Sequence, residues 1–233
     1  MSLNSASSKI RVAILDDHQG ILDGYIYRLG NHPQIDIVGT ASYGKDLESI
    51  MAKTPVDVLL LDVSVPTSPE NANPYPILYL IPSLLEIHPA HNILVISMHA
   101  DRALIRAVME SGASGYIFKD DQAAVRDLAN IIISVAGGGI FLSQIANEIL
   151  MKRGREEEET GLSPRQREAL SLCASYPNDS SAQLARRMNI SHSTIRNMLS
   201  SAYLKLGVQT RSAAVIKAQQ LGIITPPPTV YCM

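Results

Sequence analysis

The sequence predicts an α/β protein with a doubly wound, five-stranded parallel sheet, followed by a small all-α domain. Three features of the 233 residues indicate this arrangement. From residue 9 to residue 137, short apolar runs alternate with segments of helical periodicity, which is typical of strands joined by crossover helices. From residue 162 onward the chain shows only helical patterns, each opened by a capping residue. Acidic residues dominate the first part and basic residues the last.

Five apolar runs of the first part are expected to be strands. Each is short, mostly apolar and bounded by polar or turn residues, as is typical of strands buried on both faces of a parallel sheet. The runs lie at 12–15, 35–38, 56–61, 93–97 and 116–118. Helical spacing predicts helices at 21–29, 47–51, 77–87, 104–109 and 125–135, with a kink at Pro82 unless that helix starts late. Right-handed crossovers then give a doubly wound sheet.

Four short helices are predicted in the last part from the residues at their ends. Ser163 with Gln166 and Ser180 with Gln183 have the spacing of capping boxes, in which each residue satisfies a backbone N–H of the other. The other end signals are two N-caps and two glycines after helix ends: Ser191, Thr210, Gly207 and Gly222. The expected helices lie near 163–175, 180–188, 191–206 and 210–221.

These patterns divide the chain into two domains and a linker. We expect a first domain at 9–137, a linker at 138–161 and a helical domain at 162–224. Within the linker, Ser143 is placed to cap a short helix, and KRGREEEET at 152–160 is expected to be a flexible spacer. The first eight residues are expected to be a disordered lead.

Charge is divided unevenly along the chain. Residues 1–137 carry 9 Lys and Arg against 15 Asp and Glu, residues 138–161 carry 3 against 5, and residues 162–233 carry 8 against 2. The three parts therefore have net charges of −6, −2 and +6. A basic module suggests nucleic acid as a partner, although two domains with ordinary uneven surfaces would give the same counts.

Composition narrows the cellular setting. No apolar run approaches the roughly 18 to 20 residues of a membrane span, and the N-terminus has no apolar signal core. We therefore expect a cytoplasmic protein with no membrane partner. Cys173 and Cys232 have no metal-ligand spacing and are expected to stay reduced, without a part in function.

Polar side chains follow the predicted strands at the points where these strands end. Asp16 and Asp17 end the first strand, Asp62 the third, Ser97 the fourth and Lys119 the fifth. A lone Asp62 would more often be a solvated loop residue, but the carboxyl ends of parallel strands meet at one edge, which brings the five groups together. Three crowded carboxylates favour a cation such as Mg²⁺, and the lysine and hydroxyl can contact an oxyanion. The set predicts phosphoryl transfer onto a carboxylate.

The helices at 180–188 and 191–206 form a candidate helix-turn-helix. One face of the second helix is an apolar stripe, which we expect to be buried: Ile195, Leu199, Ala202 and Leu206. The opposite face carries Ser193, Arg196, Asn197 and Ser200, and suits a major groove in which Arg reads guanine and Asn reads adenine. Four cations could contact phosphates: Arg186, Arg187, Lys205 and Arg211. The alternative is a helical bundle with a solvated polar face.

Four motifs of the first part resemble the receiver domain of bacterial two-component response regulators. They are LDDH at 15–18, LLLDVSVP at 59–66, ISMHA at 96–100 and GASGYIFKD at 112–120. The resemblance implies a flavodoxin-like fold in which Asp62 accepts phosphate from a sensor histidine kinase. It also implies that Asp16, Asp17, Asp62 and the carbonyl of Ser64 hold Mg²⁺, and that Ser97 and Lys119 contact the phosphoryl group. Tyr116 would be the switch aromatic, or else an ordinary half-buried strand residue.

The last part resembles the LuxR-type DNA-binding domain, and the whole chain resembles the NarL/FixJ class of response regulators. The matching segments are LSPRQREAL, LARRMNISHSTIRNMLSSAYLKLGV and AAVIKAQQLGII. The resemblance implies a homodimer formed on activation. It also implies contacts to promoter DNA from five positions: Thr194, Arg196, Asn197, Ser200 and Lys205.

The sequence departs from the family pattern in several places. TSPENANPYP, which follows Pro66, has no glycine and predicts a longer, irregular surface loop beside the site. In the helical part, 176–179 looks two residues longer than usual, Met198 stands where His is frequent, and Ser200 is neutral where some relatives have Lys. The neutral Ser200 suggests a weaker grip on phosphate or a different base preference.

Two other functions remain open from the sequence. An aspartate-based Mg²⁺ phosphatase would also use an Asp nucleophile, but such enzymes usually carry a second Asp two positions later, where this chain has Ser64. We therefore expect that the protein is not an enzyme. A transcription regulator whose receiver never uses phosphate and instead binds a partner would keep all five groups.

Overall fold

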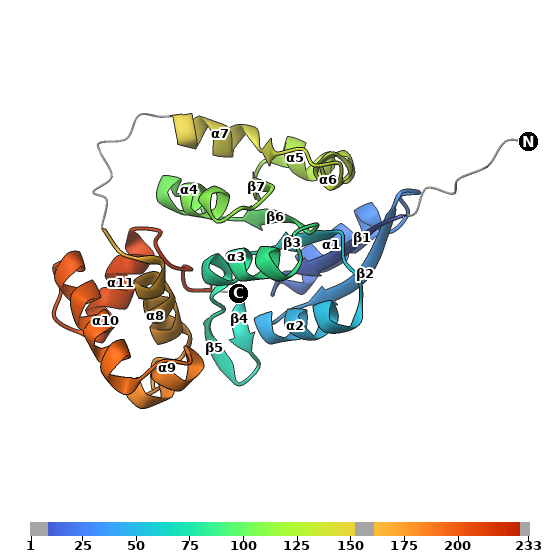
Figure 1. The fold of residues 1–233 in the computed structure, drawn as a ribbon. Coiled ribbons are helices and arrows are strands. Elements are labelled where there is room, and N and C mark those ends of the chain that lie inside the picture. Colours follow the sequence, from blue (N-terminus) through green and yellow to red (C-terminus); the bar gives the residue numbers. More distant parts are fainter. Residues whose placement is uncertain (1–8, 152–160, 229–233) are drawn as a thin grey trace, which may run out of the picture.

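The structure, a computed structural model, describes residues 9–151 and 161–228 (Figure 1). The expected disordered lead, the charged spacer at 152–160 and Cys232 lie outside these ranges. Within them, a helix-covered sheet is followed by a separate group of four helices. None of the described helices combines the length and the apolar composition that a membrane crossing requires.

The main sheet of the described residues is parallel and has six strands in the order β2-β1-β3-β6-β7-β8. Five of them are the predicted strands: β1 (Ile10–Leu15), β2 (Ile35–Ala41), β3 (Val58–Leu61), β6 (Asn92–Ser97) and β7 (Gly115–Phe118). The prediction of five strands missed β8 (Phe141–Leu142), which pairs with β7. A strand of two residues has no periodicity to detect, and it forms here because β7 offers an unpaired edge.

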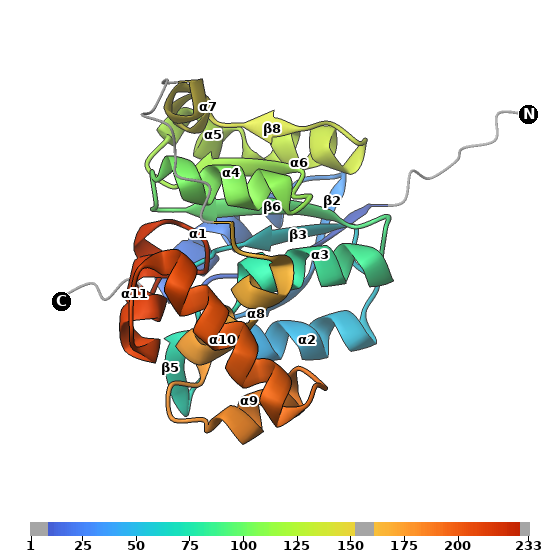
Figure 2. The ribbon, with the colours of Figure 1, turned by 60° about the vertical axis from the view of Figure 1, so that its left-hand side comes forward.

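Helices cover both faces of this sheet (Figures 1 and 2). One face packs against α1 (Gln19–Leu29), α5 (Gln122–Arg126) and α6 (Leu128–Ala136). The other packs against α2 (Gly44–Lys53), α3 (Ile77–Ile87), α4 (Arg102–Glu110) and α7 (Gln144–Met151). Alternate residues of each central strand enter the two cores, so the predicted doubly wound arrangement is confirmed.

Two helices differ in detail from the prediction. The helix expected at 125–135 is interrupted at Asp127, which ends α5 and precedes α6. The α3 helix runs through Pro82, although proline has no N–H to donate to the preceding turn.

The segment after Pro66 is more ordered than the irregular loop that was predicted. Strands β4 (Pro66–Ser68) and β5 (Asn71–Pro74) form an antiparallel hairpin, which we call the β4–β5 hairpin. The Thr67 hydroxyl donates to the Asn73 carbonyl at 2.9 Å. Next to it, Tyr75 is buried and its hydroxyl donates to Glu48 of α2 at 2.7 Å. Side-chain contacts of this kind, which composition does not reveal, explain why a segment rich in proline and asparagine forms strands.

The helical part follows its predicted end signals closely. Its helices are α8 (Pro164–Ser175), α9 (Ser181–Arg187), α10 (His192–Leu206) and α11 (Arg211–Gln220). Both capping boxes are present, Ser191 and Thr210 cap α10 and α11, and Gly207 ends α10 with a φ of 66°. The predicted stripe on α10 is buried at all four positions: Ile195, Leu199, Ala202 and Leu206.

The helical domain rests on the sheet domain through α8 and the segment after α11. β5 and α3 contact α8, and Gly222 lies so close to α4 that a Cβ there would be 2.6 Å from the Leu104 nitrogen. Figure 2 shows α10 in front of α8, on the side away from the sheet. The contact between the domains therefore leaves the outer face of α10 open.

Replacing Gly44 with alanine should destabilise the sheet domain. A Cβ at this position would overlap the ring of Tyr75, which burial and its bond to Glu48 hold in place. We expect a loss of about 1 to 3 kcal/mol in the free energy of unfolding, as for overpacked cores, measured by urea denaturation with circular dichroism.

Gly24→Ala is the matched control for this change. Gly24 lies in α1, where a Cβ would meet no atom within 4 Å. This variant should be as stable as the wild type or gain about 0.5 to 1 kcal/mol, because alanine favours helix. Equal effects at the two positions would contradict the packing of Tyr75 on Gly44.

Candidate phosphoacceptor site and nucleic-acid interface

Three carboxylates meet at the carboxyl edge of the sheet. Asp16 and Asp17 follow β1, and Asp62 follows β3, which pairs with β1. The Asp62 backbone N–H donates to the Leu15 carbonyl at 2.8 Å, so the pairing of the two strands continues to the site. Ligand atoms of Asp16, Asp17, His18 and Asp62 lie within 4.8 Å of one another. The predicted convergence of the three aspartates is therefore present in the structure.

Lys119, which follows β7, joins two of these carboxylates. Its Nζ lies 2.6 Å from Asp16 Oδ2 and 2.7 Å from Asp62 Oδ2, and all three side chains are buried. Burial alone would lower the pKa of Lys119, but Coulombic attraction to Asp62 and Asp16, with the hydrogen bonds to both, raises it. The lysine therefore carries a positive charge and offsets one of the three negative charges.

The remaining negative charge makes the cluster suitable for a cation. Burial raises the pKa of Asp16 and of Asp17, and the neighbouring Asp62 charge raises both further, so ionisation of these groups is disfavoured without a counter-ion. Asp17 Oδ1 is buried and accepts no hydrogen bond from the described residues, although His18 Nδ1 lies 2.8 Å away. The three carboxylates of this cluster supply the oxygen ligands that Mg²⁺ prefers, and Asp16, Asp17 and Asp62 would hold it.

The loops after β3 and β6 are joined by His99, a residue that the pattern of strand ends does not single out. His99 Nε2 lies 2.8 Å from Ser64 Oγ, and the backbone N–H of Ser64 donates to Asp62 Oδ1 at 3.1 Å. The His99 N–H donates to Ser97 Oγ at 3.2 Å. The motif ISMHA contains this histidine, but only the fold places it against Ser64.

Ser97 and Tyr116 are both fully buried behind the carboxylates. The Tyr116 hydroxyl donates to the His99 carbonyl at 2.6 Å, and burial raises the pKa of this phenol. Tyr116 thus contacts the loop that carries Ser97, which is compatible with the predicted role of a switch aromatic. Among the described residues Ser97 makes no hydrogen bond to Asp62. The prediction named the carbonyl of Ser64 as a ligand, whereas the bonds seen at Ser64 are made by its backbone N–H, to Asp62, and by its hydroxyl, to His99.

The α10 residues predicted to read DNA lie on its open side. They are all exposed: Ser193, Thr194, Arg196, Asn197 and Ser200. The hydroxyls of Ser193 and Thr194 lie 2.9 and 2.7 Å from the Ser191 hydroxyl, at the N-cap of the helix. Within the described ranges no hydrogen bond or ion pair engages the side chains of Arg196 or Asn197, so both are available to a ligand.

Three of the cations expected at phosphates are engaged inside the helical domain. Lys205 Nζ donates to the Gly161 carbonyl at 2.6 Å and to Gln166 Oε1 at 3.0 Å. Arg187 pairs with Asp179 at 2.7 Å and stacks 3.5 Å from the centre of the Tyr176 ring, while Arg211 donates to the Asp179 carbonyl. The longer segment at 176–179 is thus fixed by Arg187 and Arg211. The count of charges did not reveal this structural role of the two arginines.

An acidic edge with a paired lysine on a parallel sheet, joined to a helix-turn-helix, defines the class of response regulators. Residues 12–130 match the family described as "Response regulator receiver domain". Residues 160–218 match "Bacterial regulatory proteins, luxR family". The chain belongs to the response regulator family with a LuxR-type C-terminal domain, which confirms the predicted NarL/FixJ class.

Individual relatives match along almost the whole chain. The transcriptional regulatory protein MctR of Rhizobium johnstonii is 29% identical over 93% of this chain and 96% of its own. The DNA-binding transcriptional activator DevR/DosR of Mycobacterium tuberculosis is 30% identical, over 94% and 98%. A structure of RcsB from Salmonella enterica serovar Typhimurium, bound to a promoter in the presence of phosphomimetic BeF3−, superimposes with a TM-score of 0.56. It is 25% identical and covers 90% of this chain and 98% of its own.

Magnesium should stabilise the protein through the three carboxylates. At about one hundred times its Kd, a ligand that binds only the folded state adds about 2.7 kcal/mol to the free energy of unfolding. Asp17→Asn removes one ligand charge and one source of repulsion. We expect this variant to be at least as stable as the wild type without Mg²⁺ and to lose most of the stabilisation in a urea titration with Mg²⁺.

Asp36→Asn provides the control, because it makes the same charge change at an exposed position on β2. It should keep the full response to Mg²⁺. A response of Asp17→Asn equal to that of the wild type would show that the ion binds elsewhere.

Proposed function

We propose that this protein is a DNA-binding transcription regulator that is switched by phosphorylation of Asp62. The observation that carries the proposal is the bond of Lys119 to both Asp16 and Asp62, beside an unsatisfied Asp17 oxygen. This arrangement offers a nucleophilic carboxylate, a fixed cation and a cation site within one buried cluster. The family to which the chain belongs supports the same function.

The chemistry is transfer of a phosphoryl group to a carboxylate oxygen. An Asp62 oxygen attacks the phosphorus of a phosphohistidine or a small acyl phosphate, and a new O–P bond forms. The bond from phosphorus to the donor breaks, and its electron pair stays on the donor's nitrogen or oxygen. Lys119 would stay beside the group as a point charge, and Ser97 would donate a hydrogen bond once its loop closes. Mg²⁺, when bound, would neutralise part of the charge on the phosphoryl oxygens.

The second activity is recognition of promoter DNA by α10. Its exposed Arg196 and Asn197 can each make paired hydrogen bonds to a base edge in the major groove. The relatives support the assignment, since DevR/DosR is a DNA-binding activator and RcsB has been solved on promoter DNA. Two RcsB dimers have also been solved on two parallel DNAs, and by analogy we propose a homodimer on activation. A dimer would place its two α10 helices on half-sites about 34 Å apart.

We propose a sensor histidine kinase as the partner that supplies the phosphoryl group, as the receiver family suggests. We propose that the site accepts phosphate and does not turn over substrates as a phosphatase, because the residue two positions after Asp62 is Ser64, whose hydroxyl contacts His99. An aspartate-based phosphatase would need a carboxylic acid at that position for general acid–base catalysis. The relatives, which are transcription regulators, support the same choice.

Asp62→Asn should abolish phosphorylation. Wild type incubated with Mg²⁺ and acetyl phosphate should gain the mass of one phosphoryl group, because Asp62 is the carboxylate held by both Lys119 and the Ser64 N–H. Asparagine has no carboxylate oxygen to attack phosphorus, so intact-mass spectrometry should show no addition. The matched control Asp36→Asn should be labelled like the wild type. A wild type without added mass would contradict the phosphorylation mechanism and leave DNA binding untouched.

Arg196→Ala should weaken specific DNA binding by about 1 to 3 kcal/mol if Arg196 reads a base. The measurement compares affinity for a duplex that the wild type selects from a random pool with affinity for an unselected duplex at the same salt concentration. Loss on the selected duplex should exceed loss on the other. Arg28→Ala, at an exposed position of α1, is the charge-matched control and should bind both like the wild type. If Arg196→Ala weakened binding to the selected and the unselected duplex equally, Arg196 would be a phosphate contact and not a base-reading residue.

A further inference from the structure

The β4–β5 hairpin begins beside the proposed phosphoacceptor. Its first residue, Pro66, lies four positions after Asp62, and Pro66 pairs with Pro74 at the base of the hairpin. The Tyr75 N–H donates to the Val65 carbonyl at 2.9 Å, which closes this base. Since Ser64 donates to Asp62 Oδ1, a few bonds connect the carboxylate to the hairpin. A displacement of this loop is therefore carried into the hairpin.

The other side of the hairpin contacts the helical domain. Asn71 Nδ2 donates to the carbonyl of Ser175 at 2.8 Å, and the Ser175 hydroxyl donates to the Pro74 carbonyl at 2.6 Å. Ser175 is the last residue of α8 and is fully buried. The last carbonyls of a helix have no partner within the helix, so Asn71 satisfies one of them from the other domain.

Hydrogen bonds within the hairpin tie its two strands together. Asn71 Oδ1 accepts hydrogen bonds from the N–H of Asn73 at 3.1 Å and from its side chain at 2.6 Å. Thr67 bonds across to Asn73 as well, and Tyr75 anchors the base on α2 through Glu48. These bonds would carry a shift at Val65 toward Asn71 and Pro74, around the base that Tyr75 fixes on α2.

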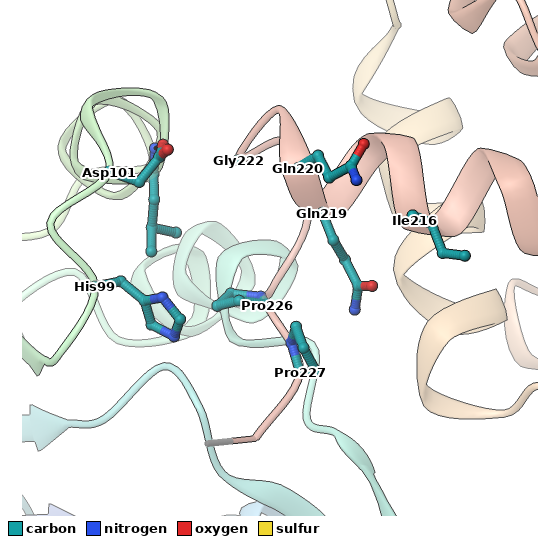
Figure 3. A pocket seen from close by; sticks show the side chains of 9 residues that line it. His99, Asp101, Ile216, Gln219, Gln220, Gly222, Pro226 and Pro227 are labelled. Carbon is teal, nitrogen blue, oxygen red and sulfur yellow. Dashed lines mark hydrogen bonds between the residues drawn. The ribbon is translucent and has the colours of Figure 1, made fainter. Parts of the chain in front are cut away.

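The loop after β6 faces the helical domain across a cavity. A cavity of about 390 Å³ separates the loop after β6 from the segment after α11, and Figure 3 shows His99 on one side with Pro226 and Pro227 opposite it. His99 Nε2 lies 2.8 Å from Ser64 Oγ. The segments beside Asp62 thus meet the helical domain directly through the hairpin and face it across the cavity at His99.

We propose that the β4–β5 hairpin is a clasp that holds the helical domain on the sheet domain and is loosened when Asp62 is phosphorylated. The inference rests on the proposed function and adds the route of its regulation. A phosphoryl group brings three oxygens and up to two negative charges into a space already closed by Lys119 and the Ser64 N–H. The loop before the hairpin has to shift to admit it.

The clasp would act on the position of the helical domain rather than on access to its reading face. The outer face of α10 is exposed while both hairpin bonds to Ser175 are formed. Their release would loosen the end of α8 and, with it, the orientation in which α10 is presented, while the contacts of α8 with α3 and of Gly222 with α4 remain. Each of the two neutral hydrogen bonds is weak enough for a ligand at Asp62 to shift this local equilibrium.

Hydrogen exchange with mass spectrometry tests the clasp on the full chain. Peptides covering 63–75 and 169–179 should exchange about fivefold faster with Mg²⁺ and BeF3− than without, the low end of the usual range for coupled sites. A peptide of the buried strand β1, which ends beside Asp16 and Asp17, should not exchange faster. Unchanged exchange in both peptides of a protein that binds BeF3− would overturn the clasp while the proposed function stands. A protein that neither binds BeF3− nor gains mass from acetyl phosphate would instead refute the proposed function.

Two variants test the clasp without any ligand at Asp62. Asn71→Ala should speed exchange of 169–179 in the helical domain, and Ser175→Ala should speed exchange of 63–75 in the sheet domain, each about fivefold. Exposed residues supply the matched controls Asn31→Ala and Ser212→Ala, which should change neither peptide. Because Ser175→Ala also removes a bond within α8, Asn71→Ala decides the outcome if the helical domain unfolds. Exchange of 169–179 unchanged by Asn71→Ala would overturn the clasp.

Discussion

The pairing of Lys119 with Asp16 and Asp62 is the interaction on which the carboxyl edge of the sheet depends. The three residues come from the ends of β7, β1 and β3, and all are buried. A buried carboxylate without a partner costs several kcal/mol, so an arrangement that separated these strand ends would leave two such groups uncompensated. The strand order therefore satisfies an electrostatic requirement as well as packing. The same requirement brings Asp62 and Asp17 close enough to share a cation.

One lysine cannot balance three carboxylates, and this imbalance defines what the site can accept. Burial and mutual repulsion raise the pKa values of Asp16 and Asp17, so the folded chain is poised to gain positive charge. A divalent cation would match this deficit of two charges, and a phosphoryl group would then add negative charge that the cation and Lys119 share. Acceptance of phosphate would thus depend on the cation, because a phosphoryl group without it would add negative charge to a cluster that already carries an excess.

Local signals explain which parts of the structure could be predicted from the sequence. Ser163, Ser180 and Gly207 act within one turn of the helices that they bound, and each was placed correctly. The carboxyl edge was predictable because parallel strands force their ends together, whatever joins them. The β8 strand and the β4–β5 hairpin were not, since one depends on the free edge of β7 and the other on contacts with α2 and α8. His99 was missed for the same reason, because its partner Ser64 lies 35 residues away.

The helical domain shows why a count of charges overstates contact with DNA. Its net charge of +6 includes Arg187 and Arg211, which fix the segment at 176–179, and Lys205, which bonds to the start of α8. These cations still attract a polyanion at a distance, but each would have to give up a bond to contact a phosphate closely. Close contact with DNA would therefore fall more heavily on Arg186 and Arg196, which are exposed, and on the backbone and hydroxyls at the start of α10. A domain built in this way would rely more on base reading, and less on phosphate contacts, than its composition suggests.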